Sequence, residues 1–138
     1  MKSMKFRDLP TIAAAVIVHG EKLLLVKRRF AEKSLSWQFP AGEVEREEGV
    51  ETAAVRETME EVGLKVSALE VLGERVLPNT GRHIAYVACE VLSGEAYVAD
   101  ANELTDVAWM TLGECRDYVP YGFAPIVEEY LEATLVLR

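Results

Sequence analysis

The sequence predicts a mixed α/β sandwich, in which helices cover a mixed β-sheet. Three observations predict it: two apolar runs of strand length near the N-terminus, two longer strand-like segments in the middle, and helix-forming segments that separate and follow them. The order strands, helix, strands, helix is typical of helices packed on the faces of a sheet. At 138 residues, the chain is expected to form one domain over residues 1–138.

The first two strands are predicted as a β-hairpin. Residues 11–18 form an apolar run of strand length, and residues 23–29 form another. Residues 19–22, which read His-Gly-Glu-Lys, have the composition of a turn between them. Residues 37–39 predict a short extended piece that ends at Pro40, because the residue before a proline is pushed toward extended backbone.

Residues 50–62 are predicted to form a helix. They have helix-forming composition with no proline or glycine, and Gly63 stands where a helix C-terminal glycine is expected. On a helical wheel, one stripe holds Val55, Met59 and Val62. We expect this stripe to face the core. The opposite side holds Val50, Ala53 and Ala54, and we expect it to be covered too, so that the helix packs on both sides.

The second half of the chain returns to strands and closes with a helix. Strand-like segments over residues 66–77 and 84–92 flank a Pro-Asn-Thr-Gly turn signal at residues 78–81. A shorter strand is predicted at residues 107–110, and a closing helix at residues 125–137. The sequence contains no repeats or low-complexity tracts.

Charge and composition narrow the possible partners. With 23 acidic and 15 basic residues, the formal net charge is −8, which disfavours binding to a nucleic-acid polymer but leaves small phosphorylated ligands open. No apolar run approaches the length of a membrane span, and the charged N-terminus does not read as a signal peptide. We expect Cys89 and Cys115 to be buried thiols, and the protein to be cytoplasmic without a membrane partner.

Three carboxylates crowd one side of the predicted helix. Glu57, Glu60 and Glu61 fall within one sector of about 100° on the helical wheel. Like charges at this spacing repel one another, and a hard divalent cation would remove the repulsion. From these residues by themselves, a solvated acidic face and a Mg²⁺ site both remain open.

The register around the triplet favours the metal site. Reading along the chain, the matching residues are Gly42, Glu48, Arg56, Glu57, Glu60, Glu61, Gly63 and Leu64. The pattern G-x5-E-x7-R-E-U-x-E-E-x-G-U, where U is a bulky aliphatic residue, resembles the signature of the Nudix hydrolases, a MutT-like family. The resemblance implies the Nudix fold, an α/β/α sandwich with a mixed central sheet.

The resemblance also implies a chemistry and a set of ligands. Nudix hydrolases cleave a diphosphate linkage by attack of water at phosphorus, with Mg²⁺ or Mn²⁺ on the helix of the signature. By this resemblance, Glu57 and Glu61 are metal ligands, and the backbone carbonyl of Gly42 completes the metal shell. Glu60 is the general base or a further metal ligand.

The remaining signature residues are expected to support the acids. Arg56 is predicted to pair with Glu48 and so to orient the catalytic carboxylates, while Gly42, Glu48 and Gly63 form the structural part of the signature. Glu103 stands where family members often supply one more acid to the metals or the water. An ordinary loop acid is the alternative for Glu103.

Two residues are candidates for binding substrate. Arg29, on the same strand face as Lys27, is predicted to meet a phosphate, although a simple surface charge is equally open. Trp109 is predicted either to stack on a base or to lie in the core.

Three positions depart from the family pattern. Thr58 replaces a bulky aliphatic residue, Ala41 replaces a glycine found in many members, and Glu47 replaces a glycine that often precedes the signature glutamate. Thr58 and Ala41 concern packing and turn shape, whereas Glu47 concerns the conformation of the loop.

The function implied is a metal-dependent hydrolase of a nucleoside diphosphate derivative. A nucleoside triphosphate, normal or oxidised, is the first expectation for the small-molecule substrate, and ADP-ribose or another nucleotide sugar is the alternative. A non-catalytic nucleotide-binding Nudix module is a further alternative. Isomerase chemistry on a prenyl diphosphate is disfavoured, because no cysteine precedes the signature. A homodimer remains open.

Overall fold

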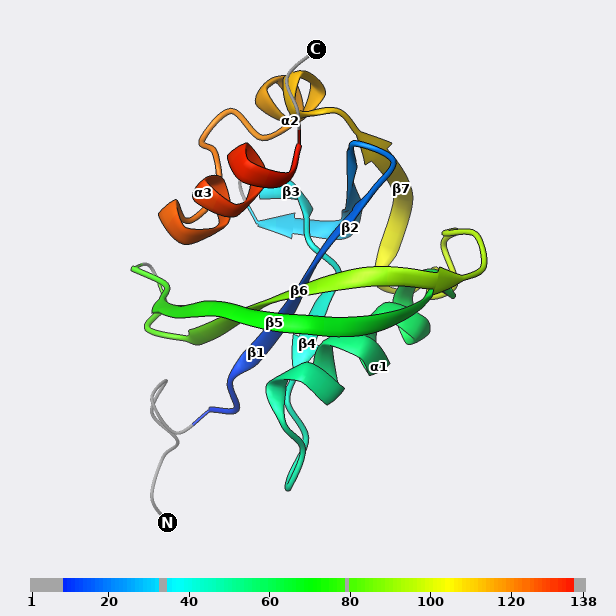
Figure 1. The fold of residues 1–138 in the computed structure, drawn as a ribbon. Coiled ribbons are helices and arrows are strands. Elements are labelled where there is room, and N and C mark those ends of the chain that lie inside the picture. Colours follow the sequence, from blue (N-terminus) through cyan, green and yellow to red (C-terminus); the bar gives the residue numbers. More distant parts are fainter. Residues whose placement is uncertain (1–8, 33–34, 79, 136–138) are drawn as a thin grey trace.

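The computed structural model describes residues 9–32, 35–78 and 80–135, and in them it forms a mixed sheet between helices (Figure 1). The elements in chain order are β1 (Ile12–His19), β2 (Lys22–Glu32), β3 (Leu35–Gln38), β4 (Ala41–Glu43), α1 (Val50–Val62), β5 (Lys65–Val76), β6 (His83–Ser93), β7 (Leu104–Met110), α2 (Leu112–Tyr118) and α3 (Pro125–Thr134). This order confirms the predicted fold class.

The seven strands form one sheet, in which β1 is the central strand. The sheet order is β3-β2-β1-β6-β5, with β4 added to β1 and β7 added to β2. β1 runs parallel to β6, and every other pairing between described strands is antiparallel. The hairpin turn joins β1 to β2 only through the pairs Val18–Leu23 and His19–Lys22. β2 therefore diverges from β1, and β4 takes the place beside the start of β1.

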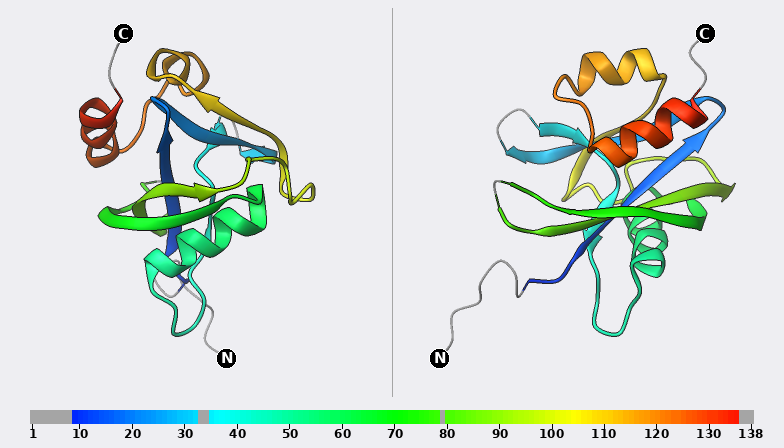
Figure 2. Two further views of the ribbon diagram at one scale, coloured as in Figure 1. Left: turned by 45° about the vertical axis from the view of Figure 1, so that its right-hand side comes forward. Right: turned by 60° about the vertical axis from the view of Figure 1, so that its left-hand side comes forward.

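The helices lie on opposite faces of the sheet (Figure 2). On one face, α1 contributes Ala53, Ala54 and Val62 to a buried cluster with Ala13 and Ala15 of β1. The other face carries α2 and α3. Because strand side chains alternate between faces, the neighbouring β1 residues belong to the second cluster. The fold is thus an α/β/α sandwich.

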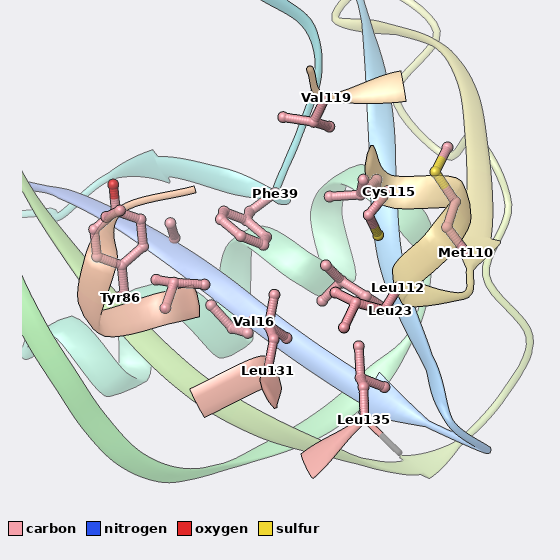
Figure 3. Packing of buried hydrophobic residues seen from close by; sticks show 14 residues of the cluster. Val16, Leu23, Phe39, Tyr86, Met110, Leu112, Cys115, Val119, Leu131 and Leu135 are labelled. Carbon is pink, nitrogen blue, oxygen red and sulfur yellow. The ribbon is translucent and has the colours of Figure 1, made fainter. Parts of the chain in front are cut away.

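The second cluster anchors the C-terminal helices (Figure 3). Val16 of β1 and Leu131 of α3 lie at its centre, and the rings of Phe39 and Tyr86 meet edge-on with centroids 6.1 Å apart. Cys115 of α2 is also buried there.

Both cysteines are buried, as predicted. Burial raises the pKa of Cys89 to about 12 and the pKa of Cys115 to about 11. Across the described part of the chain, none of the helices has the length and apolar character needed to cross a bilayer.

Two elements were not predicted from the sequence. β4 is only three residues long, and α2 follows β7 directly. The start of α2 carries a capping box, in which the Glu114 amide donates to Thr111 Oγ1 at 3.2 Å and the Thr111 amide donates to Glu114 Oε1 at 3.0 Å. Its Thr-x-x-Glu spacing was a local signal for this helix. The predicted closing helix reaches residue 137, whereas α3 ends at Thr134, and residues 136–138 lie outside the described residues.

The predicted core stripe of α1 was wrong, whereas the prediction that the side with Ala53 and Ala54 is covered is confirmed. Met59 is 45% exposed and Val55 is only half-buried, so of the predicted stripe Val62 alone is fully buried. The buried side is instead the one that holds the small residues Ala53 and Ala54. Small side chains let the helix approach the sheet closely, and the glutamates on this side are thereby turned toward the sheet.

The substitution at Thr58 is accommodated within α1. Its side chain is fully buried, and Oγ1 donates to the carbonyl of Ala54 at 2.7 Å. The buried hydroxyl therefore has a partner, which removes most of the cost of a polar atom in the core.

Candidate active site

A pocket of about 500 Å³ lies where α1, β4 and the loop before β7 meet. We call it the acidic pocket. Its lining residues are Ile12, Arg28, Gln38, Ala41, Gly42, Glu43, Glu57, Glu61, Leu77, Ile84, Asp100 and Glu103. The set contains five carboxylates and one cation, and it brings together four sequence-predicted site residues: Gly42, Glu57, Glu61 and Glu103.

Gly42 lets the backbone of β4 approach the Glu57 carboxylate. β4 is held in place by β1, where Gly42 pairs with Ala13. A Cβ atom added at Gly42 would overlap the Glu57 carboxyl group. A larger residue here would force the Glu57 side chain to shift, so with glycine the β4 backbone and an acidic side chain face one another across the same small space.

Glu61 is held on both carboxylate oxygens. Its side chain is 5% exposed; Oε2 accepts from Arg28 Nη1 at 2.8 Å, and Oε1 accepts from the Ala41 amide at 3.1 Å. Burial raises the pKa of Glu61, and Arg28 offsets that shift only in part. The pKa of Glu57 is also raised by burial, with partial compensation from Arg56.

Arg56 ties the loop before α1 to the helix. It makes the predicted pair with Glu48 through two hydrogen bonds, of 2.8 and 2.9 Å. This pairing holds the pKa of Glu48 at about 2 and raises the pKa of Arg56. The third nitrogen, Nη1, donates to Glu57 Oε1 at 2.9 Å, so Arg56 also orients a pocket carboxylate.

Glu47 occupies the loop that Arg56 holds. Its φ is +64°, a left-handed conformation in which glycine is favoured. The backbone therefore turns here at some steric cost.

Glu60 points away from the acidic pocket. Its side chain is 53% exposed, and it pairs with Arg56 Nη1 at 3.2 Å. The difference follows from the helix geometry, because Glu60 lies on the far side of Glu57 from Glu61 on the wheel. Glu60 is therefore outside the pocket lining, although it shares Arg56 Nη1 with Glu57.

The loop over residues 94–103 is attached to the end of α1. Gly63 ends the helix with φ +65°, and the carbonyls left free there accept from the loop. The Ala99 amide donates to the Glu61 carbonyl at 2.9 Å, and the Tyr97 amide donates to the Val62 carbonyl at 3.0 Å. These bonds place the segment that carries Asp100 and Glu103 beside the glutamates of α1.

Three of the charged pocket residues were not predicted from the sequence: Glu43, Asp100 and Arg28. β2 residues Leu24 and Val26 face α1, so by alternation Arg28 does too. The predicted candidate, Arg29, does not line the acidic pocket, and its Nε donates to the Ala101 carbonyl at 2.8 Å. Alternation grouped Lys27 with Arg29, but it did not say which group faced the site.

Trp109 lies outside the acidic pocket. Its ring meets His19 with centroids 5.8 Å apart, and both residues line a second pocket of about 500 Å³ with Leu64, Val91, Gly94, Glu95 and Ala96. We call this the Trp109 pocket. Trp109 is half-buried and packs against the cluster under α1.

The donors in the acidic pocket fit a hard divalent cation. Among the described residues, no three His, Cys, Asp or Glu side chains already converge as a metal cage, and Glu57 and Glu61 each bind an arginine. Mg²⁺ needs only one or two carboxylates, since it keeps several waters. Two poorly hydrated carboxylates and the cradle at Gly42, which a Cβ would fill, meet that requirement.

Comparison with known proteins identifies the family. A family model for the NUDIX domain matches residues 9–132. The chain is 30% identical to the CTP pyrophosphohydrolase of Escherichia coli (strain K12) over 92% of both chains. It is 31% identical to a putative 8-oxo-dGTP diphosphatase 2 of Mycobacterium tuberculosis, over 77% of this chain and 76% of the relative.

A solved NUDIX hydrolase from Nitrosomonas europaea has a TM-score of 0.73 and 23% identity, with 92% of this chain and 90% of that chain covered. Of another Nudix hydrolase structure from the same organism, this chain spans 61%. The chain belongs to the Nudix (MutT-like) family, as an enzyme of the Nudix pyrophosphohydrolase class.

Proposed function

We propose that this enzyme uses a divalent cation to cleave the diphosphate linkage of a nucleoside triphosphate, normal or oxidised. The single observation that carries the proposal is the convergence of Glu57, Glu61, Glu103 and the Gly42 backbone in the acidic pocket. The names of the relatives support the substrate class, since one acts on CTP and another is described as a putative 8-oxo-dGTP diphosphatase.

Glu57, Glu61 and the Gly42 carbonyl are the proposed ligands of Mg²⁺ or Mn²⁺. When bound, the cation supplies neutralisation of the charge on the phosphoryl oxygens and lowers the pKa of bound water. Arg56 keeps the Glu57 carboxylate in place through its 2.9 Å bond. The Ala41 amide holds the Glu61 carboxylate in place through its 3.1 Å bond to Oε1.

Glu103 is our candidate for the general base. Like Asp100, it is a pocket carboxylate on the loop over residues 94–103, and its backbone is held at both ends: the Glu103 amide donates to the Asp100 carbonyl at 3.2 Å, and the Glu103 carbonyl accepts from the Arg29 amide at 2.9 Å. A pocket carboxylate that lies on a different element from the proposed metal ligands is suited to accept a proton from the attacking water. Glu60 is the alternative base, although its side chain points out of the pocket.

We also propose the domain organisation, the location and the partner of the enzyme. The enzyme acts as a single domain over residues 1–138, it resides in the cytoplasm, and its partner is a small nucleotide. The excess of acidic residues supports the absence of a nucleic-acid polymer among its partners. A homodimer remains a proposal that a sedimentation experiment would test.

The test is release of phosphate or pyrophosphate from a panel of nucleotides that includes CTP, oxidised dGTP and ADP-ribose. We expect hydrolysis of a triphosphate with Mg²⁺, its loss in EDTA, and its return on addition of excess Mg²⁺. Turnover that persists in EDTA would contradict the metal assignment. Preference for ADP-ribose would move the proposal to nucleotide sugars, and binding without turnover would favour a non-catalytic module.

A further inference from the structure

Arg28 is the only cation among the described residues that line the acidic pocket. It shares that pocket with five carboxylates, on Glu43, Glu57, Glu61, Asp100 and Glu103. A nucleotide carries several negative charges on its phosphates, so this lining repels it at every charged position except Arg28.

In the structure, the guanidinium of Arg28 is bound to Glu61. Nη1 donates to Glu61 Oε2 at 2.8 Å, whereas the second bond, from Nη2 to the Ala41 carbonyl, is longer at 3.3 Å. The side chain of Arg28 is 16% exposed and that of Glu61 is 5% exposed, so the pair is largely shielded from water. In this arrangement Arg28 supplies the positive charge that the buried Glu61 carboxylate needs.

A divalent cation and the guanidinium compete for the same carboxylate. Both are positive, and their mutual repulsion is strong beside Glu61, whose carboxylate is largely shielded from water. The planar fork of a guanidinium also matches the paired oxygens of a phosphate, which gives it a second favourable partner in the same pocket. Arg28 therefore has one anionic partner before substrate arrives and another afterwards.

We propose that Arg28 is an exchangeable counter-ion. It neutralises Glu61 in the metal-free protein, and once a divalent cation binds at Glu61 the guanidinium binds a phosphate oxygen of the nucleotide. This inference rests on the proposed function, since it assumes that the acidic pocket takes a cation and a nucleotide. Because coupling between two ligands is reciprocal, Arg28 would make each of them strengthen the binding of the other.

For the Arg28→Met variant, the proposal predicts opposite effects on the responses to the two ligands, Mn²⁺ and a nucleotide analogue. In the metal-free variant Glu61 is left buried without its cation, so the melting temperature falls, and Mn²⁺ restores more stability than in the wild type. A triphosphate analogue with a methylene bridge in place of the scissile oxygen binds about tenfold or more weakly in the presence of Mn²⁺. A merely structural ion pair would not weaken the nucleotide once the metal has restored the fold.

The experiment combines melting curves with and without MnCl2 and calorimetric titration of the methylene-bridged analogue. Arg116→Met is the matched control, because Arg116 makes an ion pair with Glu128 through bonds of 2.9 and 2.8 Å and does not line the acidic pocket. We expect the control to melt earlier with an unchanged response to Mn²⁺ and unchanged analogue affinity. An Arg28→Met variant that behaves in the same way overturns the proposal.

Arg28→Lys carries the test if Arg28→Met does not fold without metal. It keeps the charge beside Glu61 but loses the two-pronged fork, so we expect a near-normal response to Mn²⁺ and several-fold weaker analogue binding. Wild-type analogue affinity in Arg28→Lys would overturn the proposal. Failure of the proposed function is distinguishable, because the wild type would then bind neither Mn²⁺ nor the analogue.

Discussion

The two pockets of this protein have the same size and opposite chemistry. Each has a volume of about 500 Å³. The acidic pocket contains five carboxylates and one arginine, whereas the Trp109 pocket contains one carboxylate, Glu95, beside an aromatic pair. Volume therefore does not identify the site, and the concentration of poorly hydrated charge does.

One loop separates the two pockets. Residues 94–96 line the Trp109 pocket, and Asp100 and Glu103, further along the same loop, line the acidic pocket. Between them, the amides of Tyr97 and Ala99 are bonded to the last carbonyls of α1. The end of this helix thus fixes the boundary between a charged compartment and an aromatic one.

The largest effect is expected at the centre of the acidic pocket. Glu57→Gln removes a proposed metal ligand while keeping the shape of the side chain, so turnover should fall by about 10³-fold. Glu95→Gln makes the same chemical change in the Trp109 pocket, and there we expect less than about a threefold change. Steady-state hydrolysis with Mg²⁺ measures both. Equal losses in the two variants would erase the distinction between the pockets.

The next largest effect on turnover should distinguish Glu103, which lines the acidic pocket, from Glu60, which does not. Glu103→Gln removes the proposed base, and we expect turnover to fall by about 10²-fold. Glu60→Gln alters an exposed side chain that pairs with Arg56, so we expect a much smaller loss. Both variants should retain the wild-type melting temperature to within a few degrees. A reversed order would make Glu60 the base and remove Glu103 from that role.

Much of this fold could be predicted because its signals are local. The β1–β2 hairpin, α1 with Gly63 at its end, and strands β5 and β6 each have their pattern within a short stretch of sequence. β4 has no such pattern, because three residues beside a distant strand owe their structure to that pairing. α2 did carry a local signal, the Thr111–Glu114 capping box, although this helix was not predicted.

The sequence predicted the types of residue in the site more readily than the directions in which their side chains point. The helical wheel grouped three glutamates, but the side of α1 that meets the sheet is decided by where two alanines allow close packing. The outward position of Glu60 follows from that packing. Strand alternation likewise left open whether Arg28 or Arg29 faces α1, because the answer depends on which side of the sheet the helix covers.

The dependence of the free energy of unfolding on pH should distinguish the carboxylates of the acidic pocket from Glu48. The folded-state pKa values of Glu57 and Glu61 are raised above the ordinary value of 4.5, so between 4.5 and the raised values the folded protein binds more protons than the unfolded one. The metal-free protein therefore loses stability as pH rises through that window. Glu48, with its pKa of about 2, has the opposite effect and in a lower pH range. Its contribution to stability is present above about pH 4.5 and is lost as pH falls toward 2.

A divalent cation binds the deprotonated carboxylates, so the rise in melting temperature on adding Mn²⁺ should grow from pH 4.5 upward. Melting curves between pH 4.5 and 7.5, with and without MnCl2, measure this rise. In Glu57→Gln it should be smaller at every pH. A rise in melting temperature that is greatest at pH 4.5 would place the bound metal elsewhere.

The smallest effect is expected at Trp109, and its size decides what the second pocket does. Stacking of a base on an aromatic side chain is worth about 1–3 kcal/mol, or about 5- to 150-fold in affinity. The Trp109 ring already packs on His19, and its pocket shares no lining residue with the acidic pocket. We therefore expect Trp109→Leu to change KM by less than about threefold once its melting temperature confirms a folded protein. A KM raised more than fivefold at unchanged kcat would mean instead that the base stacks on Trp109, and the loop between the pockets would then lie under the bound nucleotide.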